Sequence, residues 1–257
     1  MDRPAPSRPI KAGNRLLGGA VPLICVPLVG ATSEVVMGEV SNLPPGVDVV
    51  EIRIDGWDEV EDLDLSVGFI REIRSAIGDM PVILTCRGHW EGGIKEVAES
   101  VKDRIYSMAI EEKLVDFVDK ELSYGYEKLA KLKASAQAHG VGLIVSFHDF
   151  ERTPSPSFIY SQMVTQIRFG ADVAKVALMP RSEEDVLKVF EATLAIRRDF
   201  PHIPLITMSM GALGQVSRLV GGLYGSDLTF AVGGAPSAPG QPSVDAVRTA
   251  FGLIYGR

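Results

Sequence analysis

The chain has 257 residues, of which 46% are hydrophobic and 23% charged, with 33 acidic against 26 basic side chains. These proportions are typical of a soluble globular protein and exclude long disorder, and two cysteines are too few for a disulfide scaffold. The formal net charge of −7 argues against nucleic acid or an anionic membrane as the main partner. An anionic substrate would therefore need a local basic site.

The N-terminal segment is basic and rich in proline. The uncharged stretch 16–33 that follows it superficially resembles the apolar part of a signal peptide, but it contains Pro22, Pro27 and three glycines, which suit neither a membrane helix nor a leader helix. We expect residues 1–14 to form a flexible tail and residues 15–257 to form one domain. Cys25 and Cys86 lie in apolar stretches, as free thiols often do, and this favours a reducing, cytoplasmic location.

Short apolar segments rich in β-branched residues recur along the chain at intervals of about 29 residues, the length of one strand–loop–helix unit. Eight strands are predicted from them, at residues 23–28, 47–53, 81–86, 115–121, 141–147, 172–178, 203–208 and 228–232.

The segments between these strands have helical periodicity. Ser182, followed by three acids, predicts the start of a helix that ends near Pro201. Further helices are predicted over residues 65–77, 94–113, 124–139, 157–169 and 243–255. Alternating strands and helices imply a parallel sheet, and eight units in about 250 residues favour an α/β fold of the (β/α)₈ TIM-barrel type in a single domain. An open, doubly wound sheet is the alternative.

Polar side chains concentrate toward the carboxyl ends of the predicted strands. Successive strand residues point to opposite faces. Val50 and Ile52 therefore face the surrounding helices, and Glu51 and Arg53 point into the barrel. The same alternation points further residues into the barrel, namely Arg87, Asp119, Glu121, Ser146, His148, Lys175, Met208 and Met210. A TIM barrel builds its active site at this end.

Lys175 interrupts an otherwise apolar strand, so we expect its ammonium to be desolvated. Desolvation favours the neutral amine, which is a nucleophile towards a ketone or aldehyde. The alternative is a structural lysine that pairs with Asp119 or Glu121 across the barrel.

His148 ends the strand next to that of Lys175 and is a candidate general base, although a capping or hydrogen-bonded structural role is the alternative. The three other histidines lie in loops or at a helix end. No His or Cys pair has metal-ligand spacing, and no phosphate loop or dinucleotide fingerprint occurs in the sequence. We therefore expect chemistry that needs no metal and no cofactor.

Taken in order along the strands, several short motifs resemble those of the type I 3-dehydroquinate dehydratases, from about Pro22 to Arg257. The matching segments are 51–55, 85–87 with 91–93, 119–122, 146–150 with 153–154, 174–177, 208–218, 225–230 and 237–241. The resemblance implies a (β/α)₈ barrel, usually a homodimer, that dehydrates the small molecule 3-dehydroquinate to 3-dehydroshikimate in the shikimate pathway, which leads to chorismate and the aromatic amino acids.

The resemblance also implies roles for individual residues. Lys175 would form an imine with the substrate ketone, and His148, with a pKa near working pH, would move the protons. Glu91 would orient His148, although a solvated loop acid is the alternative. Arg218 would bind the substrate carboxylate. The ring hydroxyls would be held by Glu51, Arg53 and Arg87, the loop residues Ser237 and Gln241 would close over the substrate, and Met208, Met210 and Phe230 would be apolar walls or plain core.

One position departs from the family pattern, because Pro27 stands where many members have a substrate-contacting serine. Two other functions remain open at the sequence level. A class I, imine-forming aldolase would also use a strand-borne lysine, and a non-catalytic ligand-binding barrel would keep the fold without the chemistry. The converging Arg53, Arg87, Lys175 and Arg218 predict a basic pocket within an acidic protein.

Overall fold

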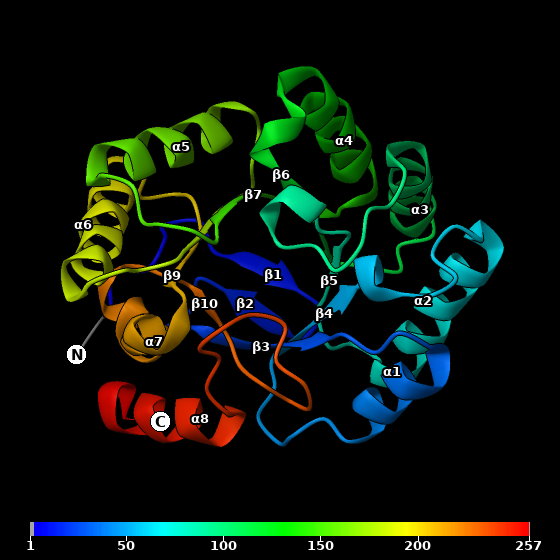
Figure 1. Cartoon of the computed structure of the whole chain (residues 1–257), viewed down its shortest axis with the longest axis horizontal. Helices are drawn as coiled ribbons and strands as arrows, with labels where there is room; N and C mark the ends of the chain where they lie inside the picture. The colour runs from blue at the N-terminus through cyan, green and yellow to red at the C-terminus, as the bar shows by residue number, and fades with distance from the viewer. Residues whose placement is uncertain (1–2, 257) are drawn as a thin grey trace.

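The computed structural model describes residues 3–256, in which eight parallel strands form a nearly closed barrel surrounded by helices (Figure 1). The strands pair in the order β10-β3-β4-β5-β6-β7-β8-β9. They are β3 (Leu23–Leu28), β4 (Val49–Arg53), β5 (Val82–Thr85), β6 (Phe117–Glu121), β7 (Gly142–Asp149), β8 (Val173–Leu178), β9 (Leu205–Ser209) and β10 (Leu228–Phe230). The outer helices are α1 (Ser33–Ser41), α2 (Leu63–Ile77), α3 (Glu99–Glu111), α4 (Tyr126–His139), α5 (Pro156–Arg168), α6 (Glu183–Asp199), α7 (Gly211–Val220) and α8 (Val244–Tyr255).

This architecture confirms the predicted (β/α)₈ barrel and excludes the open sheet. Two helices were not predicted: α1 buries little apolar surface, and α7 opens with Gly211 and contains Gly214. The helix expected from residue 94 begins only at Glu99, and the Ile94 N–H instead donates to the carboxylate of Asp55 at 2.9 Å. A contact with a residue 39 positions away thus replaces the start of the expected helix.

The alternation of strand side chains holds around the barrel. Inside, one apolar cluster contains Val49, Ile83, Phe117, Ile144 and Val173. The intervening strand residues, such as those at 50, 52, 118 and 145, belong to a different cluster that includes apolar residues of the helices. The interior of the barrel is therefore a packed core, and the polar inward residues follow it toward the carboxyl ends of the strands.

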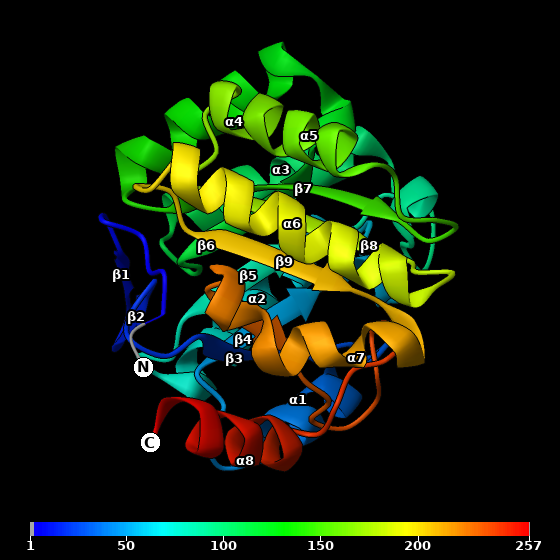
Figure 2. The same ribbon diagram turned by 90° about the vertical axis from the view of Figure 1, so that its left-hand side faces the viewer.

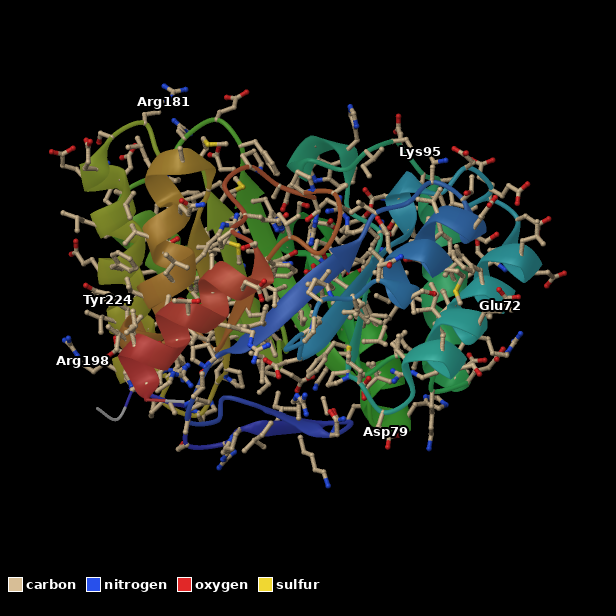
Figure 3. All side chains as sticks on the ribbon, turned by 90° about the horizontal axis from the view of Figure 1, so that it is seen from below. Glu72, Asp79, Lys95, Arg181, Arg198 and Tyr224 are labelled. Atoms are coloured by element: carbon tan, nitrogen blue, oxygen red, sulfur yellow. The ribbon has the colours of Figure 1, made fainter. Side chains whose placement is uncertain are left out.

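The amino end of the barrel is covered by a hairpin of β1 (Ile10–Ala12) and β2 (Arg15–Leu17) (Figure 2). Ala12 and Leu17 are buried within the inner cluster. In Figure 3 the hairpin lies at one end of the molecule, close to Asp79, whereas Lys95, Arg181 and the orange loop 231–243 lie at the other. No helix within residues 3–256 is long and apolar enough to cross a membrane.

Residues 3–14 are ordered parts of the fold, which corrects the expectation of a flexible tail over residues 1–14; residues 1 and 2 lie outside the described range. Arg3 is buried and forms an ion pair with Asp227, and it donates to the carbonyl oxygens of Gly19 at 2.6 Å and Ser226 at 2.9 Å. The proline-rich composition gave no sign of this anchor, because its ion-pair partner, Asp227, lies 224 residues away.

Asp227 itself closes the seam between β9 and β10. Its carboxylate accepts from the Leu205 N–H at 2.7 Å, and its own N–H donates to the Leu205 carbonyl at 2.7 Å. Arg197 of α6 pairs with the same carboxylate at 2.5 Å. Side chains thus supply part of the hydrogen bonding that joins β9 and β10, the two end strands of the pairing order.

Candidate active site

A pocket opens at the carboxyl ends of the strands, where sequence reasoning placed the site. It is lined by all nine predicted site residues, Glu51, Arg53, Arg87, Glu91, His148, Lys175, Arg218, Ser237 and Gln241. Gly92, Phe150, Ala177, Met208, Met210, Phe230 and Ala238 complete the lining. The strand alternation and the loop motifs therefore bring these residues together as expected.

Lys175 lines this pocket and is buried, with 4% of its surface exposed. Its Nζ donates to Asp119 Oδ2 at 2.7 Å and lies 3.7 Å from Glu51 Oε1, and the Phe230 ring is 4.7 Å away. The ion pair expected of a structural lysine is thus present. It does not remove the lysine from the pocket, so the two descriptions are compatible.

Arg87 lines the pocket and contacts residues of β6 and β7. Its guanidinium pairs with Asp119 at 2.9 Å and Glu121 at 2.7 Å, and it donates to Ser146 Oγ at 2.7 Å. Although burial favours the neutral acid, the charges of Arg87 and Lys175 hold the pKa of Asp119 well below its usual range. Arg87, Asp119, Glu121, Lys175 and Ser146 therefore form one connected network of ion pairs and hydrogen bonds.

His148 is oriented by Glu91. One carboxylate oxygen of Glu91, Oε2, accepts from the His148 backbone N–H at 2.8 Å and lies 3.0 Å from Nδ1. Glu91 is only 5% exposed, which excludes the solvated loop acid. With the Glu91 carboxylate ionised, Nδ1 carries the hydrogen, and the lone pair on Nε2 is left free to accept a proton.

The ionisation of this pair is shifted by its surroundings. Burial lowers the pKa of His148 well below its usual value, and the positive charges of Arg87 and Lys175 add to the effect. Burial also raises the pKa of Glu91 to about 7. The imidazole is therefore neutral near pH 7, rather than half protonated as a pKa near working pH would have made it.

Arg218, on α7, is the cation of this pocket that lacks an acidic partner within residues 3–256. Its Nη1 lies 3.3 Å from Met208 Sδ and its Nη2 donates to the Pro239 carbonyl at 3.2 Å, while Nε has no partner in the described structure. Burial lowers its pKa to about 10, so the group stays charged at neutral pH. A buried guanidinium fork in this state is suited to an anionic ligand.

The loop 231–243 covers the pocket from the side of β10. The Ser237 N–H donates to Gln241 Oε1 at 2.9 Å, and Gln241 Nε2 donates to Ser237 Oγ at 3.0 Å. Gly240 has φ +76°, and a Cβ there would lie 2.1 Å from the Gly211 carbonyl oxygen. The loop is thus held against the first turn of α7, beside Arg218.

The charge balance of the pocket differs from the predicted basic pocket. Arg53 forms two hydrogen bonds to Asp55, both 2.9 Å long, and Arg87 and Lys175 also face carboxylates. The acids Glu51, Asp55, Asp119 and Glu121 thus offset most of the positive charge. Within residues 3–256, Arg218 is the cation of the pocket that no carboxylate pairs with, so attraction for an anion is local to one side of the pocket.

Several residues of this network were not among the predicted site residues, including Asp55, Asp119, Glu121, Ser146 and Ser123. Strand alternation had pointed Asp119 and Ser146 inward, but it gave no reason to rank them above other polar residues. Ser123, which donates to Glu91 Oε1 at 3.4 Å, lies in a short turn after β6. Pro27 lies in β3 in register with Glu51 and offers no hydroxyl.

The sequence and fold match one family throughout. The family model for type I 3-dehydroquinase matches residues 24–257. A 3-dehydroquinate dehydratase of Albidiferax ferrireducens is 39% identical over 251 residues, covering 96% of this chain and 95% of the relative. The crystal structure of 3-dehydroquinate dehydratase from Geobacillus kaustophilus superposes with a TM-score of 0.93 at 38% identity, covering 98% of each chain.

A second solved relative, type I 3-dehydroquinate dehydratase of Clostridium difficile with covalently modified comenic acid, has a TM-score of 0.92 and 34% identity, covering 97% of this chain and 98% of that one. These matches confirm the family suggested by the sequence motifs and set aside both the aldolase and the non-catalytic barrel. The chain belongs to the type I 3-dehydroquinase family.

Proposed function

We propose that this chain dehydrates 3-dehydroquinate to 3-dehydroshikimate, a step of the shikimate pathway toward chorismate and the aromatic amino acids. It is then a lyase that acts on a small molecule. Its family membership supports the reaction. The observation that carries the mechanism is the placement of a buried lysine, an oriented histidine and an arginine with no acidic partner within residues 3–256 in one pocket.

In this mechanism Lys175 forms an imine with the C3 ketone of the substrate. The positively charged imine withdraws electrons and acidifies the adjacent C2–H. The neutral His148, whose Nδ1–H faces Glu91, takes that proton through Nε2 and returns it to the C1 hydroxyl as water leaves. The tautomer held by Glu91 is the one this step requires.

The remaining residues hold the substrate. Arg218 binds its carboxylate, because a bidentate ion pair would give this buried fork the acidic partner that residues 3–256 do not supply. Glu51, Arg53 and Arg87 contact the ring hydroxyls, and Ser237 and Gln241 close over the ring from the loop 231–243. Met208, Met210 and Phe230 form the apolar walls of the pocket.

Borohydride reduction during turnover of 3-dehydroquinate tests the mechanism. We expect a stable adduct on Lys175 in intact and peptide mass spectra, and none in Lys175→Met. Lys120→Met is a matched control, since Lys120 is also buried on a barrel strand but pairs with Asp103 at 3.0 Å outside the pocket. An unmodified wild-type enzyme that still turns over substrate would contradict the imine.

We further infer a homodimer in the cytoplasm. The family resemblance supports the dimer, and the two buried cysteines, both free thiols, suit a reducing compartment. Light scattering after gel filtration tests the first inference, with a single monomer mass as the contrary result. Cell fractionation tests the second.

A further inference from the structure

Asp119 has no role in the proposed mechanism, although it is the residue closest to the reacting nitrogen. It is fully buried on β6, and each of its oxygens is engaged. Oδ2 accepts from Lys175 Nζ at 2.7 Å and lies 2.9 Å from Arg87 Nη2, and Oδ1 accepts from Ser146 Oγ at 2.6 Å. Such a carboxylate has little freedom to move away from the nitrogen.

We propose that Asp119 is a catalytic residue whose carboxylate is the counter-ion of the Lys175 imine and keeps that imine protonated during turnover. The inference rests on the proposed function, because it concerns the intermediate of that reaction. Imine formation converts an ammonium and a ketone into an iminium and water: a C–N bond forms, the C–O bond breaks, and the oxygen leaves with two of the three ammonium hydrogens. The nitrogen keeps one hydrogen and one positive charge, so a counter-ion placed for the ammonium is also placed for the iminium.

The charge on the iminium decides the rate of the next step. Only the protonated imine is a strong electron sink, and a buried positive charge is costly unless an opposite charge faces it. Asp119 supplies this charge at direct contact. Glu51 Oε1, at 3.7 Å from Nζ, is farther away and already accepts from Thr85 at 2.8 Å.

Several other groups also face this nitrogen or its immediate partners. Glu51 and Arg53 come from β4, Arg87 follows β5, His148 comes from β7, and the Cys25 thiol lies beneath in β3. Arg87 and Arg53 oppose a second positive charge. Without Asp119 their fields would favour the neutral imine, which would leave C2–H less acidic.

The absorbance of the product imine provides a direct test. 3-Dehydroshikimate bound to the lysine is a conjugated imine, and its protonated form absorbs at longer wavelength than its neutral form. Titration of the wild-type complex should show the protonated form throughout the pH range in which the enzyme stays folded. In Asp119→Asn the neutral form should appear inside that range, at least two pH units below the highest pH at which the wild-type imine is still protonated. Its kcat should fall about a hundredfold, and the borohydride adduct should still form.

Ser146→Ala is the matched control, since it removes a hydrogen bond to Oδ1 in the same buried network and leaves the Asp119 charge. Its iminium should titrate as in wild type. An unshifted titration in Asp119→Asn, or loss of its adduct while circular dichroism shows a folded barrel, would overturn the proposal. If Asp119→Asn does not fold, the wild-type titration decides alone: a midpoint equal to that of the same imine made with a free alkylamine would refute the counter-ion. A wild-type enzyme that forms no imine would instead refute the proposed mechanism itself.

Discussion

Two buried ion clusters lie at opposite ends of the barrel, and each consists of one aspartate that faces two cations. At the amino end, Asp227 faces the guanidinium groups of Arg3 and Arg197. At the carboxyl end, Asp119 faces Arg87 and Lys175. Each carboxylate therefore has two cationic partners and almost no exposed surface.

The clusters differ in what else the cations contact. Arg3 and Arg197 donate to main-chain carbonyls, including Gly19 at 2.6 Å and Ile203 at 2.7 Å, and so join chain segments. Lys175 and Arg87 line a pocket. The amino-end cluster thus stabilises the seam of the barrel. The carboxyl-end cluster instead positions charged side chains in the pocket, where a substrate can bind. Changes in the two clusters should accordingly separate stability from activity.

The largest effect is expected for His148→Ala. This variant should still form the Lys175 adduct with 3-dehydroquinate but turn over about 10²–10⁴-fold more slowly, because a positioned proton carrier is lost. Steady-state kinetics with mass analysis of the reduced adduct measures both quantities. His139→Ala, at the carboxyl end of α4, is the control, since that ring contacts the Ser135 carbonyl far from the pocket. Near-normal turnover in His148→Ala would show that another group moves the proton.

Arg218→Lys and Arg197→Lys compare the two ends directly. Arg218→Lys loses the planar fork, so kcat/KM should fall about 10–100-fold, mainly through KM, with little change in thermal stability. Arg197→Lys should lower the thermal stability and leave kcat/KM nearly unchanged. The reason is that the hydrogen bonds of Arg197 to Asp227 and to the carbonyls of Ile203 and Gly225 hold the seam. Thermal melts and substrate saturation curves on both variants check the comparison. An equal loss of both properties in both variants would refute the separation.

The sequence was sufficient to predict the barrel and the pocket because both follow from local patterns. The alternation of Glu51 and Arg53 with Val50 and Ile52 depends only on strand geometry, and so does the inward position of Lys175. The family motifs then identified residues on loops, such as Glu91 and Gln241, that no periodicity could place.

The sequence did not predict the contacts of the N-terminal segment, because the ion-pair partner of this segment is distant along the chain. Arg3 and Asp227 are 224 residues apart, and nothing in a proline-rich N-terminal segment specifies an ion pair with the start of the last strand. The pairing of Arg53 and Arg87 with carboxylates was missed for a related reason. Counting cations in the pocket ignores the acids Asp55 and Asp119, whose direction toward those cations depends on side-chain packing.

Arg3→Ala tests whether the N-terminal anchor matters to the amino-end cluster alone. Removing one cation from a buried pair is destabilising, and because Arg197 still faces Asp227 we expect a loss of about 2–3 kcal/mol, roughly 5–10 °C in Tm. Turnover at moderate temperature should not change. Arg8→Ala is the control, because Arg8 is exposed in the same segment. A melt identical to wild type would mean that the anchor contributes nothing to stability.

The smallest effect, and the most specific to the carboxyl end, is the pH dependence imposed by Glu91. Its pKa is raised to about 7 by burial, so as the pH falls through this value the carboxyl group gains a proton. A protonated Glu91 can donate to His148 Nδ1, which places the ring hydrogen on Nε2 and removes the base. We therefore expect kcat/KM to decline on the acid side with a midpoint near pH 7, in the pH–rate profile of the free enzyme.

Glu91→Gln tests this assignment. In this variant the His148 backbone N–H still selects the amide oxygen, which keeps the hydrogen on Nδ1, so activity should persist. The acid limb of the profile should move to lower pH, toward the depressed pKa of His148. Glu99→Gln, at a partly exposed ion pair with Lys128, should leave the limb in place. A limb that stays near pH 7 in Glu91→Gln would assign the titration to another group.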